Sequence, residues 1–337
     1  MPPIASAVLR LAGAGLLAAV VPGAAAAFEL SLPLACTPGI DCVVQHYFDR
    51  DAGDDHRDYR CGHQTYDGHD GVDIRIPDLR AMEAGVAVLA AAPGTVRATR
   101  DGMPDVDYAE DPDAVKDREC GNGIMVDHDG GWATQYCHMK KGSIAVREGD
   151  RVETGTPLGE VGLSGMTEIP HLHFTVYRDD VEVDPFALDP DGDDPACTFA
   201  GDAGTGIWSP AAEAALPYRP AFVLNAGFAG APVEMADIEA GGVALPTPTS
   251  PALVFYGRAI GLEAGDAQYI VILAPDGSVF SESAVDPVDR PKAQYFAFTG
   301  RKLRADAWPS GTWTGRYSVI RDGMEVAARE ATFEMPE

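Results

Sequence analysis

Basic residues are scarce in this chain. It has 25 Lys and Arg residues against 52 Asp and Glu residues, a formal net charge of −27 over 337 residues. Such a surface repels nucleic acid and anionic lipid head groups. We therefore expect no nucleic-acid partner, and we interpret the excess of acids as a solvated coat that keeps an exported protein soluble.

Long hydrophobic runs are also lacking. The apolar stretch 11–21 is too short and too rich in Gly and Ala for a good membrane span. It follows Arg10, the single charge among residues 1–27, and precedes four alanines that end at Ala27. This order predicts a secretory signal peptide over residues 1–27, with an uncleaved anchor as the alternative. We expect a periplasmic or secreted protein with no stable membrane insertion after cleavage.

The chain has no CxxC pair. Six cysteines in an exported chain favour up to three disulfides over metal thiolates. We expect Cys120 to pair with Cys137, because residues 123–127 and 132–138 form strands around an Asp129-Gly130 turn that brings their outer ends together. The sequence leaves three pairings open for the other four cysteines, which are Cys36, Cys42, Cys61 and Cys197.

A long helical period is missing as well. The length and the 46% apolar content suffice for two packed cores. Short β-type runs separated by Gly and Pro predict an all-β fold for the first domain. These runs are residues 86–91, 94–98, 123–127, 132–138, 159–161 and 171–178. Residues 99–119 interrupt them with an acidic insertion, which we interpret as a solvated loop at the rim of the site.

The chain divides into five parts by composition. After the signal peptide, a Cys-bearing arm (28–60) precedes the first β domain (61–197) and a Gly/Pro/Ala-rich linker (198–219). Residues 220–337 alternate as β-strands do, with Trp313, Tyr317 and Val319 on one strand face, which predicts an immunoglobulin-like β-sandwich. This last domain has no histidine, so we assign it no chemistry. We expect a fragment ending near Gly201 to fold and to keep the activity.

Five residues of the first domain form a candidate site. In an extended strand His171 and His173 face the same way, and His69 and Asp73 can close the rest of a metal shell. Imidazole and carboxylate ligands together suit zinc. With His138 there are five candidates, but only three can be ligands if zinc keeps an open position. The other two would then accept a proton or stabilise an oxyanion.

The remaining histidines are His46, His56, His63 and His128, which we interpret as surface or structural residues. Among them, we expect His63 to line the groove.

Seven motifs follow one another in the first domain. They are GHDGVD (68–73), APGTV (92–96), GNGIMVDH (121–128), TQYCHM (134–139), GDRVETG (149–155), GLSG (162–165) and PHLHF (170–174). In this order, residues 61–187 resemble the lysostaphin and LytM-type zinc peptidases that cut peptidoglycan peptides. The insertion 99–119 and Cys137 beside His138 depart from that family's general pattern.

The resemblance implies a role for each candidate. His69, Asp73 and His173 would be the ligands of one zinc ion per chain, while His138 and His171 would be the catalytic pair beside the water. It also implies a compact, two-sheeted LytM-like β fold with the metal in an open groove.

Two functions fit this site. The first is a zinc endopeptidase that hydrolyses the peptide cross-links of bacterial peptidoglycan with metal-activated water. The alternative is a non-catalytic zinc-braced cell-wall module that binds or activates a partner hydrolase. The two spare histidines favour the enzyme, because a structural zinc site closes with four protein ligands and needs no base. The expected partner is a peptidoglycan peptide, and a protein partner, if there is one, would bind the C-terminal sandwich.

Overall fold

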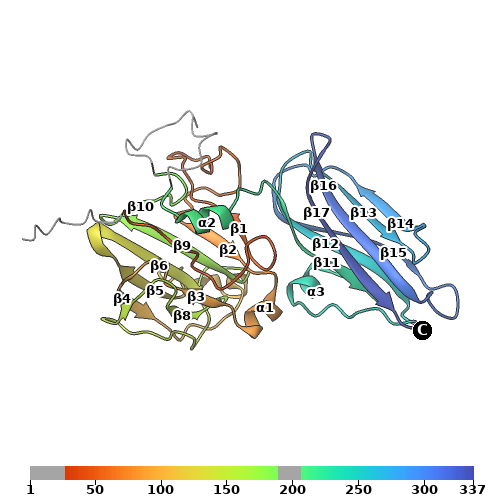
Figure 1. The fold of residues 1–337 in the computed structure, drawn as a ribbon, viewed down its shortest axis with the longest axis horizontal. Helices are drawn as coiled ribbons and strands as arrows, with labels where there is room; N and C mark the ends of the chain where they lie inside the picture. Colours follow the sequence, from red (N-terminus) through yellow and green to blue (C-terminus); the bar gives the residue numbers. More distant parts are fainter. Residues whose placement is uncertain (1–26, 189–205) are drawn as a thin grey trace, which may run out of the picture.

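The computed structural model describes residues 27–188 and 206–337. These residues form two β-rich bodies side by side, built from antiparallel sheets, which confirms the all-β prediction (Figure 1). None of the helices in the described part of the chain is long and apolar enough to cross a membrane. Residues 1–26 of the expected signal peptide lie outside the described residues.

The first body contains the site. Its strands are β1 (Val43–His46), β2 (Val72–Arg75), β3 (Ala87–Leu89), β4 (Gly94–Arg100), β5 (Asn122–Asp127), β6 (Trp132–Met139), β7 (Arg151–Val152), β8 (Pro157–Glu160), β9 (His171–Arg178) and β10 (Val181–Val183). Its helical segments are α1 (Leu79–Ala84), η1 (Tyr108–Glu110), η2 (Pro112–Val115), η3 (Asp129–Gly131) and α2 (Pro210–Ala215). The predicted runs match β3–β6, β8 and β9 to within a few residues.

The order of the main sheet brings the motifs together. Strands run β1-β2-β9-β6-β5-β4-β7, with β10 also on β9. Strand β9 therefore lies between β2 and β6, and His173 is in register with Asp73 on one side and with Cys137 on the other. The next residues along β9, Leu172 and Phe174, point to the opposite face and are fully buried in the core. The alternation predicted for this strand is confirmed.

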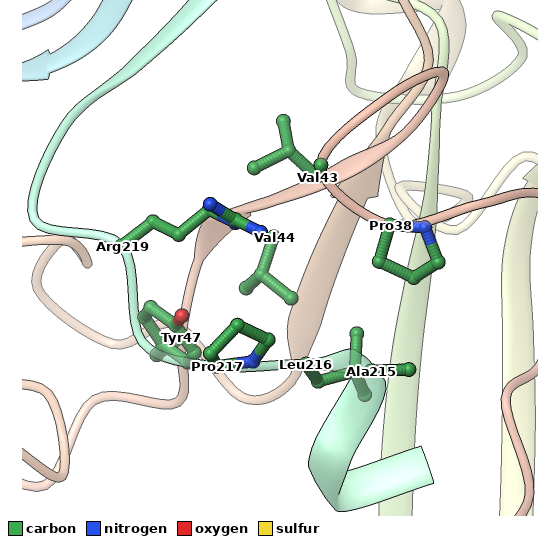
Figure 2. A pocket seen from close by; sticks show the side chains of 9 residues that line it. Pro38, Val43, Val44, Tyr47, Ala215, Leu216, Pro217 and Arg219 are labelled. Atoms are coloured by element: carbon green, nitrogen blue, oxygen red, sulfur yellow. The ribbon is translucent and has the colours of Figure 1, made fainter. Parts of the chain in front are cut away.

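The arm 28–60 is part of the first body. Its strand β1 pairs with β2, and Leu30 forms a bridge with Trp208. The described part of the expected linker also packs there, because Ile207, Trp208 and Leu216 join the hydrophobic core. Figure 2 shows the contact, with Leu216 opposite Val44 of β1. The Gly, Pro and Ala content of residues 198–219 indicated a linker, but these large apolar side chains are better buried than exposed.

The second body consists of two antiparallel sheets. Its strands are β11 (Phe222–Ala229), β12 (Ala252–Leu262), β13 (Ala267–Leu273), β14 (Val279–Val285), β15 (Lys292–Lys302), β16 (Gly311–Arg321) and β17 (Met324–Met335), with α3 (Met235–Glu239) between β11 and β12. The sheet orders are β11-β12-β15 and β14-β13-β16-β17.

One core lies between these two sheets. It contains Phe255 of β12 with Trp313, Tyr317 and Val319 of β16, which confirms the predicted inward face of that strand. The fourth strand, β14, pairs with the third strand, β13. In constant-type immunoglobulin domains the fourth strand instead joins the sheet of the first, second and fifth strands. The immunoglobulin-like assignment stays a prediction.

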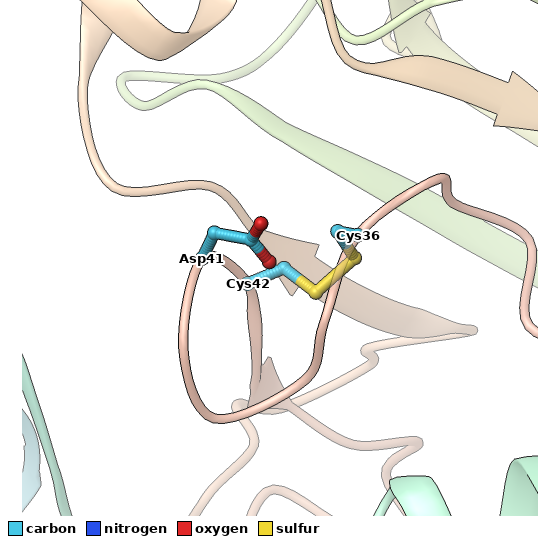
Figure 3. Close-up of side chains that lie close together, drawn as sticks. All are labelled: Cys36, Asp41 and Cys42. Atoms are coloured by element: carbon cyan, nitrogen blue, oxygen red, sulfur yellow. A yellow bond between two sulfur atoms is a disulfide. The ribbon is translucent and has the colours of Figure 1, made fainter.

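The disulfide between Cys120 and Cys137 is confirmed. A second one joins Cys36 to Cys42, beside Asp41 (Figure 3). Both sulfur atoms belong to that bond, so Cys36 and Cys42 offer no thiolate to a metal beside Asp41. Cys61 is disulfide-bonded too, and Cys197 lies outside the described residues.

The two bodies meet at buried charges. Arg75 of β2 and Arg258 of β12 both contact the carboxylate of Glu239 on α3, and both arginine side chains are fully buried. Arg258 also donates to the carbonyl of Pro77 at 2.6 Å. The second body is therefore attached directly to β2, the strand that carries Asp73.

Candidate functional site

His69, Asp73 and His173 converge on one point. His69 lies in the turn before β2, Asp73 on β2 and His173 on β9. The Nε2 atom of His69 is 3.2 Å from Asp73 Oδ1 and 3.3 Å from His173 Nδ1, and His173 Nδ1 is 2.9 Å from the same Asp73 oxygen. Four tetrahedral ligands at about 2.1 Å from zinc would lie about 3.4 Å apart. The three donor atoms thus have nearly the separation that a zinc ion requires.

The outer nitrogens of the two histidines are already engaged. His69 Nδ1 donates to the carbonyl of Tyr47 at 2.6 Å, and His173 Nε2 lies 3.0 Å from Asp70 Oδ1. In a neutral imidazole this leaves the lone pair on the inner nitrogen. Histidine ligands in metal sites commonly donate their other N–H to a carbonyl or carboxylate in this way. The residues present therefore fit a zinc ion.

The electrostatics of this group favour a cation. Burial would raise the pKa of Asp73, but the imidazoles of His69 and His171 outweigh burial and hold that pKa well below its ordinary value. Burial likewise lowers the pKa of His173, but hydrogen bonds to Asp70 and Asp73 outweigh it and raise the pKa to about 9. The same carboxylates that hold a proton on His173 would favour a metal ion, and metal binding releases that proton.

His138 and His171 lie beside this group. Their ring centroids are 4.7 Å apart, and His171 Nε2 is 3.3 Å from Asp73 Oδ1. Each Nδ1 atom is tied to a backbone carbonyl, that of Ser164 at 2.8 Å for His138 and that of Ile169 at 2.9 Å for His171. In a neutral ring the lone pair then lies on Nε2, which at His171 faces Asp73 Oδ1. Burial, followed by the neighbouring His171 and His173, lowers the pKa of His138 well below its ordinary value.

The position of His138 depends on two glycine-rich turns. His138 has φ 60°, a left-handed conformation that is uncommon for a residue with a side chain. The carbonyl of Ser164 that it contacts lies against Gly121, where an added Cβ would be 2.3 Å from that oxygen. The Ser164 hydroxyl donates to Met139. Ser164 is therefore a turn residue.

The acidic insertion supports the same turn. The carboxylate of Asp105 accepts hydrogen bonds from Leu163 N and Lys141 N, both at 2.9 Å, and Tyr108 N donates to the carbonyl of Thr167. Residues 99–119 are thus anchored to the loop between β8 and β9. The expectation of a loop near the rim agrees with these contacts, while the short helices η1 and η2 within it were not expected.

His46 is the residue that sequence reasoning missed. The sequence indicates a surface or structural role for it, yet His46 Nδ1 is 2.9 Å from Asp73 Oδ2, the carboxylate oxygen that faces away from the histidine ligands. The pairing of β1 with β2 places it there. The arm has little periodicity, so the sequence contained no signal for that pairing. His63 lies farther out, in a cavity that it shares with His46 and His56.

Comparison with known proteins agrees with this geometry. Residues 67–185 match the model of Peptidase family M23. The cell division protein DipM of Caulobacter vibrioides is 30% identical over 106 residues, which are 32% of this chain and 14% of that protein. The peptidoglycan DD-endopeptidase ShyA of Vibrio cholerae is also 30% identical over 106 residues, 32% of this chain and 19% of its own length.

Among solved structures, the catalytic domain of the M23 protein EnpA from Enterococcus faecalis is 21% identical, with a TM-score of 0.31. That match covers 44% of this chain and 91% of the solved catalytic domain. This chain spans less than a third of the length of the curated relatives named here. The resemblance to LytM-type peptidases is confirmed for the first domain.

Proposed function

We propose that this protein is a zinc-dependent endopeptidase that hydrolyses peptide cross-links of bacterial peptidoglycan. The observation that carries the proposal is the pair His138 and His171, two buried imidazoles that face the three-donor group with their Nδ1 atoms tied to carbonyls. A structural zinc site would have four protein ligands and no use for two further bases.

His69, Asp73 and His173 would hold the metal. A zinc ion bound there supplies Lewis acidity, which polarises the scissile carbonyl and makes water nucleophilic near neutral pH. Two further groups orient the histidine ligands. The carbonyl of Tyr47 orients His69, and Asp70 orients His173, so that both present a lone pair to the cation.

His138 and His171 would perform the proton transfers. Because each Nδ1 donates to a carbonyl, each neutral ring offers its Nε2 lone pair to the attacking water and can accept the proton. Once protonated, the same Nε2–H can donate to the developing oxyanion or to the leaving amine. Burial lowers the pKa of His138, which keeps that ring neutral before the reaction.

The substrate and the location follow from the relatives and from the disulfides. ShyA and ShyB of Vibrio cholerae are named DD-endopeptidases of peptidoglycan. These names favour cleavage of a cross-link between two D-configured residues over cleavage of a glycine bridge. The disulfides Cys36–Cys42 and Cys120–Cys137 support a periplasmic or secreted protein, because disulfides persist in oxidising compartments.

The test is digestion of purified peptidoglycan by the full chain without its signal peptide, with the products read by mass spectrometry. We expect new peptide termini at the cross-links, their loss on chelation and their return with added zinc. The His138→Ala variant serves as a zinc-loaded control without turnover. A folded, zinc-loaded protein that releases no peptide from peptidoglycan would contradict the enzyme and favour the binding module.

A further inference from the structure

A cavity lies where the two bodies meet. Its volume is about 240 Å³. His46 and Tyr66 line it from the first body, and Leu262, Glu263, Lys292 and Ala293 line it from the second body. The second-body residues come from the end of β12, the segment after it and the start of β15. Both bodies therefore contribute walls to a single cavity.

This cavity adjoins the metal-binding group. His46 is in contact with Asp73, through Nδ1 and Oδ2 at 2.9 Å. The ring of Tyr66 lies 4.5 Å from the ring of His69, and Tyr66 is 46% exposed. Two residues of the cavity wall thus touch two of the three metal-binding residues. A substrate that extends from the site past His46 and Tyr66 would enter the space beneath the second body.

The wall formed by the second body is held in place. Glu239 joins Arg75 to Arg258, and Arg75 Nη1 also donates to Gln45 Oε1 at 2.9 Å and to Gln294 Oε1 of β15 at 3.2 Å. Gln45 precedes His46 on β1, and Gln294 follows Ala293. Hydrogen bonds from a single buried guanidinium therefore fix both sides of the cavity relative to one another.

Size and chemistry point to part of a peptide. Pockets that enclose a complete small ligand have volumes of about 300–1,000 Å³, so a smaller cavity suits one portion of a longer substrate. The lining combines imidazoles and apolar Leu262 with Lys292 and Glu263, whose charged groups are paired with Asp289 and Arg321. A cross-linked peptide has two chains that meet at the scissile bond, and both carry charged and amide groups.

We propose that the cavity between the two bodies binds one of the two peptide chains of a cross-linked substrate, so that the C-terminal domain forms part of the substrate-binding site. The inference rests on the proposed function, because it names a subsite for that substrate. It also assigns a role to a domain that has no histidine or cysteine.

The experiment uses the full chain and a bulky side chain in the cavity. Ala293→Trp fills the space at an exposed position, and Ala284→Trp on β14, also exposed, is the matched control outside the cavity. With soluble cross-linked muropeptides we expect Ala293→Trp to raise KM about tenfold with kcat little changed, as expected for lost ground-state binding. Unchanged zinc content and an unchanged unfolding midpoint would show that the fold is intact.

A second measurement does not require turnover. In the His138→Ala background, the same two tryptophan substitutions are compared for binding of the cross-linked muropeptide by calorimetry, and Pro291→Trp provides a second way to fill the cavity. We expect weaker binding for the Ala293 and Pro291 variants only. The inference would be overturned if Ala293→Trp and Pro291→Trp bind the muropeptide as tightly as the parent protein does, or if Ala284→Trp loses as much affinity as they do. Binding without hydrolysis by the wild type would instead overturn the proposed enzyme and leave the subsite standing.

Discussion

The side chains of His171 and His173 lie two positions apart on β9 and have different neighbours. His173 Nδ1 lies 2.9 Å from Asp73 Oδ1 and 3.3 Å from His69 Nε2. His171 Nε2 lies 3.3 Å from the same oxygen, but its ring packs against His138 and its Nδ1 donates to Ile169. We predict that His173→Ala loses zinc and activity together. His171→Ala should keep zinc and lose turnover by a factor of about 100 or more, because a proton-transfer group is removed. Metal analysis and hydrolysis rates on both variants measure this.

Location in the fold cannot explain such a contrast, since both residues belong to one strand. His138→Ala should behave as His171→Ala does. Loss of zinc from His171→Ala with retention in His173→Ala would show that the two roles are exchanged, and full activity in both would remove the catalytic assignment.

His46 makes a separate prediction for a single residue. Its ring holds the second oxygen of Asp73, and residues that orient metal ligands typically contribute 10–100-fold to metal affinity, as a rough range. We predict that His46→Ala weakens zinc binding by about that factor, measured by competition with a chromophoric chelator. His56→Ala, a partly exposed imidazole without contact to Asp73, should bind zinc as the wild type does. Equal affinity in His46→Ala would reduce His46 to a packing residue.

Two glycine turns give a prediction for the elements that support the site. Gly121 and Gly142 both have left-handed φ values, 67° and 78°, so alanine adds similar backbone strain at either position. Only at Gly121 would the new Cβ meet the Ser164 carbonyl; around Gly142 nothing lies within 4 Å. We predict that Gly121→Ala lowers kcat and leaves zinc bound, because it displaces the carbonyl that orients His138.

The control separates strain from displacement. Gly142→Ala should lose roughly 1 kcal/mol of stability and keep its kcat. If both variants lose the same activity, the turn around Ser164 does not position His138, and the loss comes from the backbone alone.

For the complete protein, the contact between the bodies is the feature to test. Glu239 is the carboxylate shared by Arg75 and Arg258, which are both fully buried. We predict that Glu239→Gln lowers the free energy of unfolding by about 3–5 kcal/mol, because two buried guanidinium groups lose their counter-charge. Chemical denaturation measures this, with the exposed Glu330→Gln as control. If Glu239→Gln lowers the free energy of unfolding no more than Glu330→Gln does, the two guanidinium groups are solvated or paired elsewhere.

The same contact changes an expectation from the sequence. A fragment ending near Gly201 was expected to fold, but it would lack Ile207, Trp208 and Leu216 of the first core and the carboxylate of Glu239 beside Arg75. Removing large buried side chains costs several kcal/mol each. The first body alone would need at least the residues up to 219, and Arg75 would still lose its partner.

Local patterns in the chain sufficed for much of this protein. Alternation along residues 171–178 predicted that His171 and His173 share one face, because successive side chains of a strand point to opposite sides. The structure buries Leu172 and Phe174 on the other face. The hairpin around Asp129-Gly130 predicted the pairing of Cys120 with Cys137, since a tight turn fixes which residues face each other. The motifs yielded five candidate residues, and the family resemblance implied His69, Asp73 and His173 among them as ligands; these three converge in the structure.

What local patterns could not contain are contacts between distant segments without periodicity or motif. His46 reaches Asp73 because β1 of the arm pairs with β2, and Ile207 and Trp208 fill a core from within a stretch whose composition indicates a linker. Arg75 and Glu239 are 164 positions apart in the chain. Such pairings form when the complete chain packs, because burial of apolar area and pairing of buried charge depend on which surfaces meet. Neighbouring residues in the sequence do not specify that.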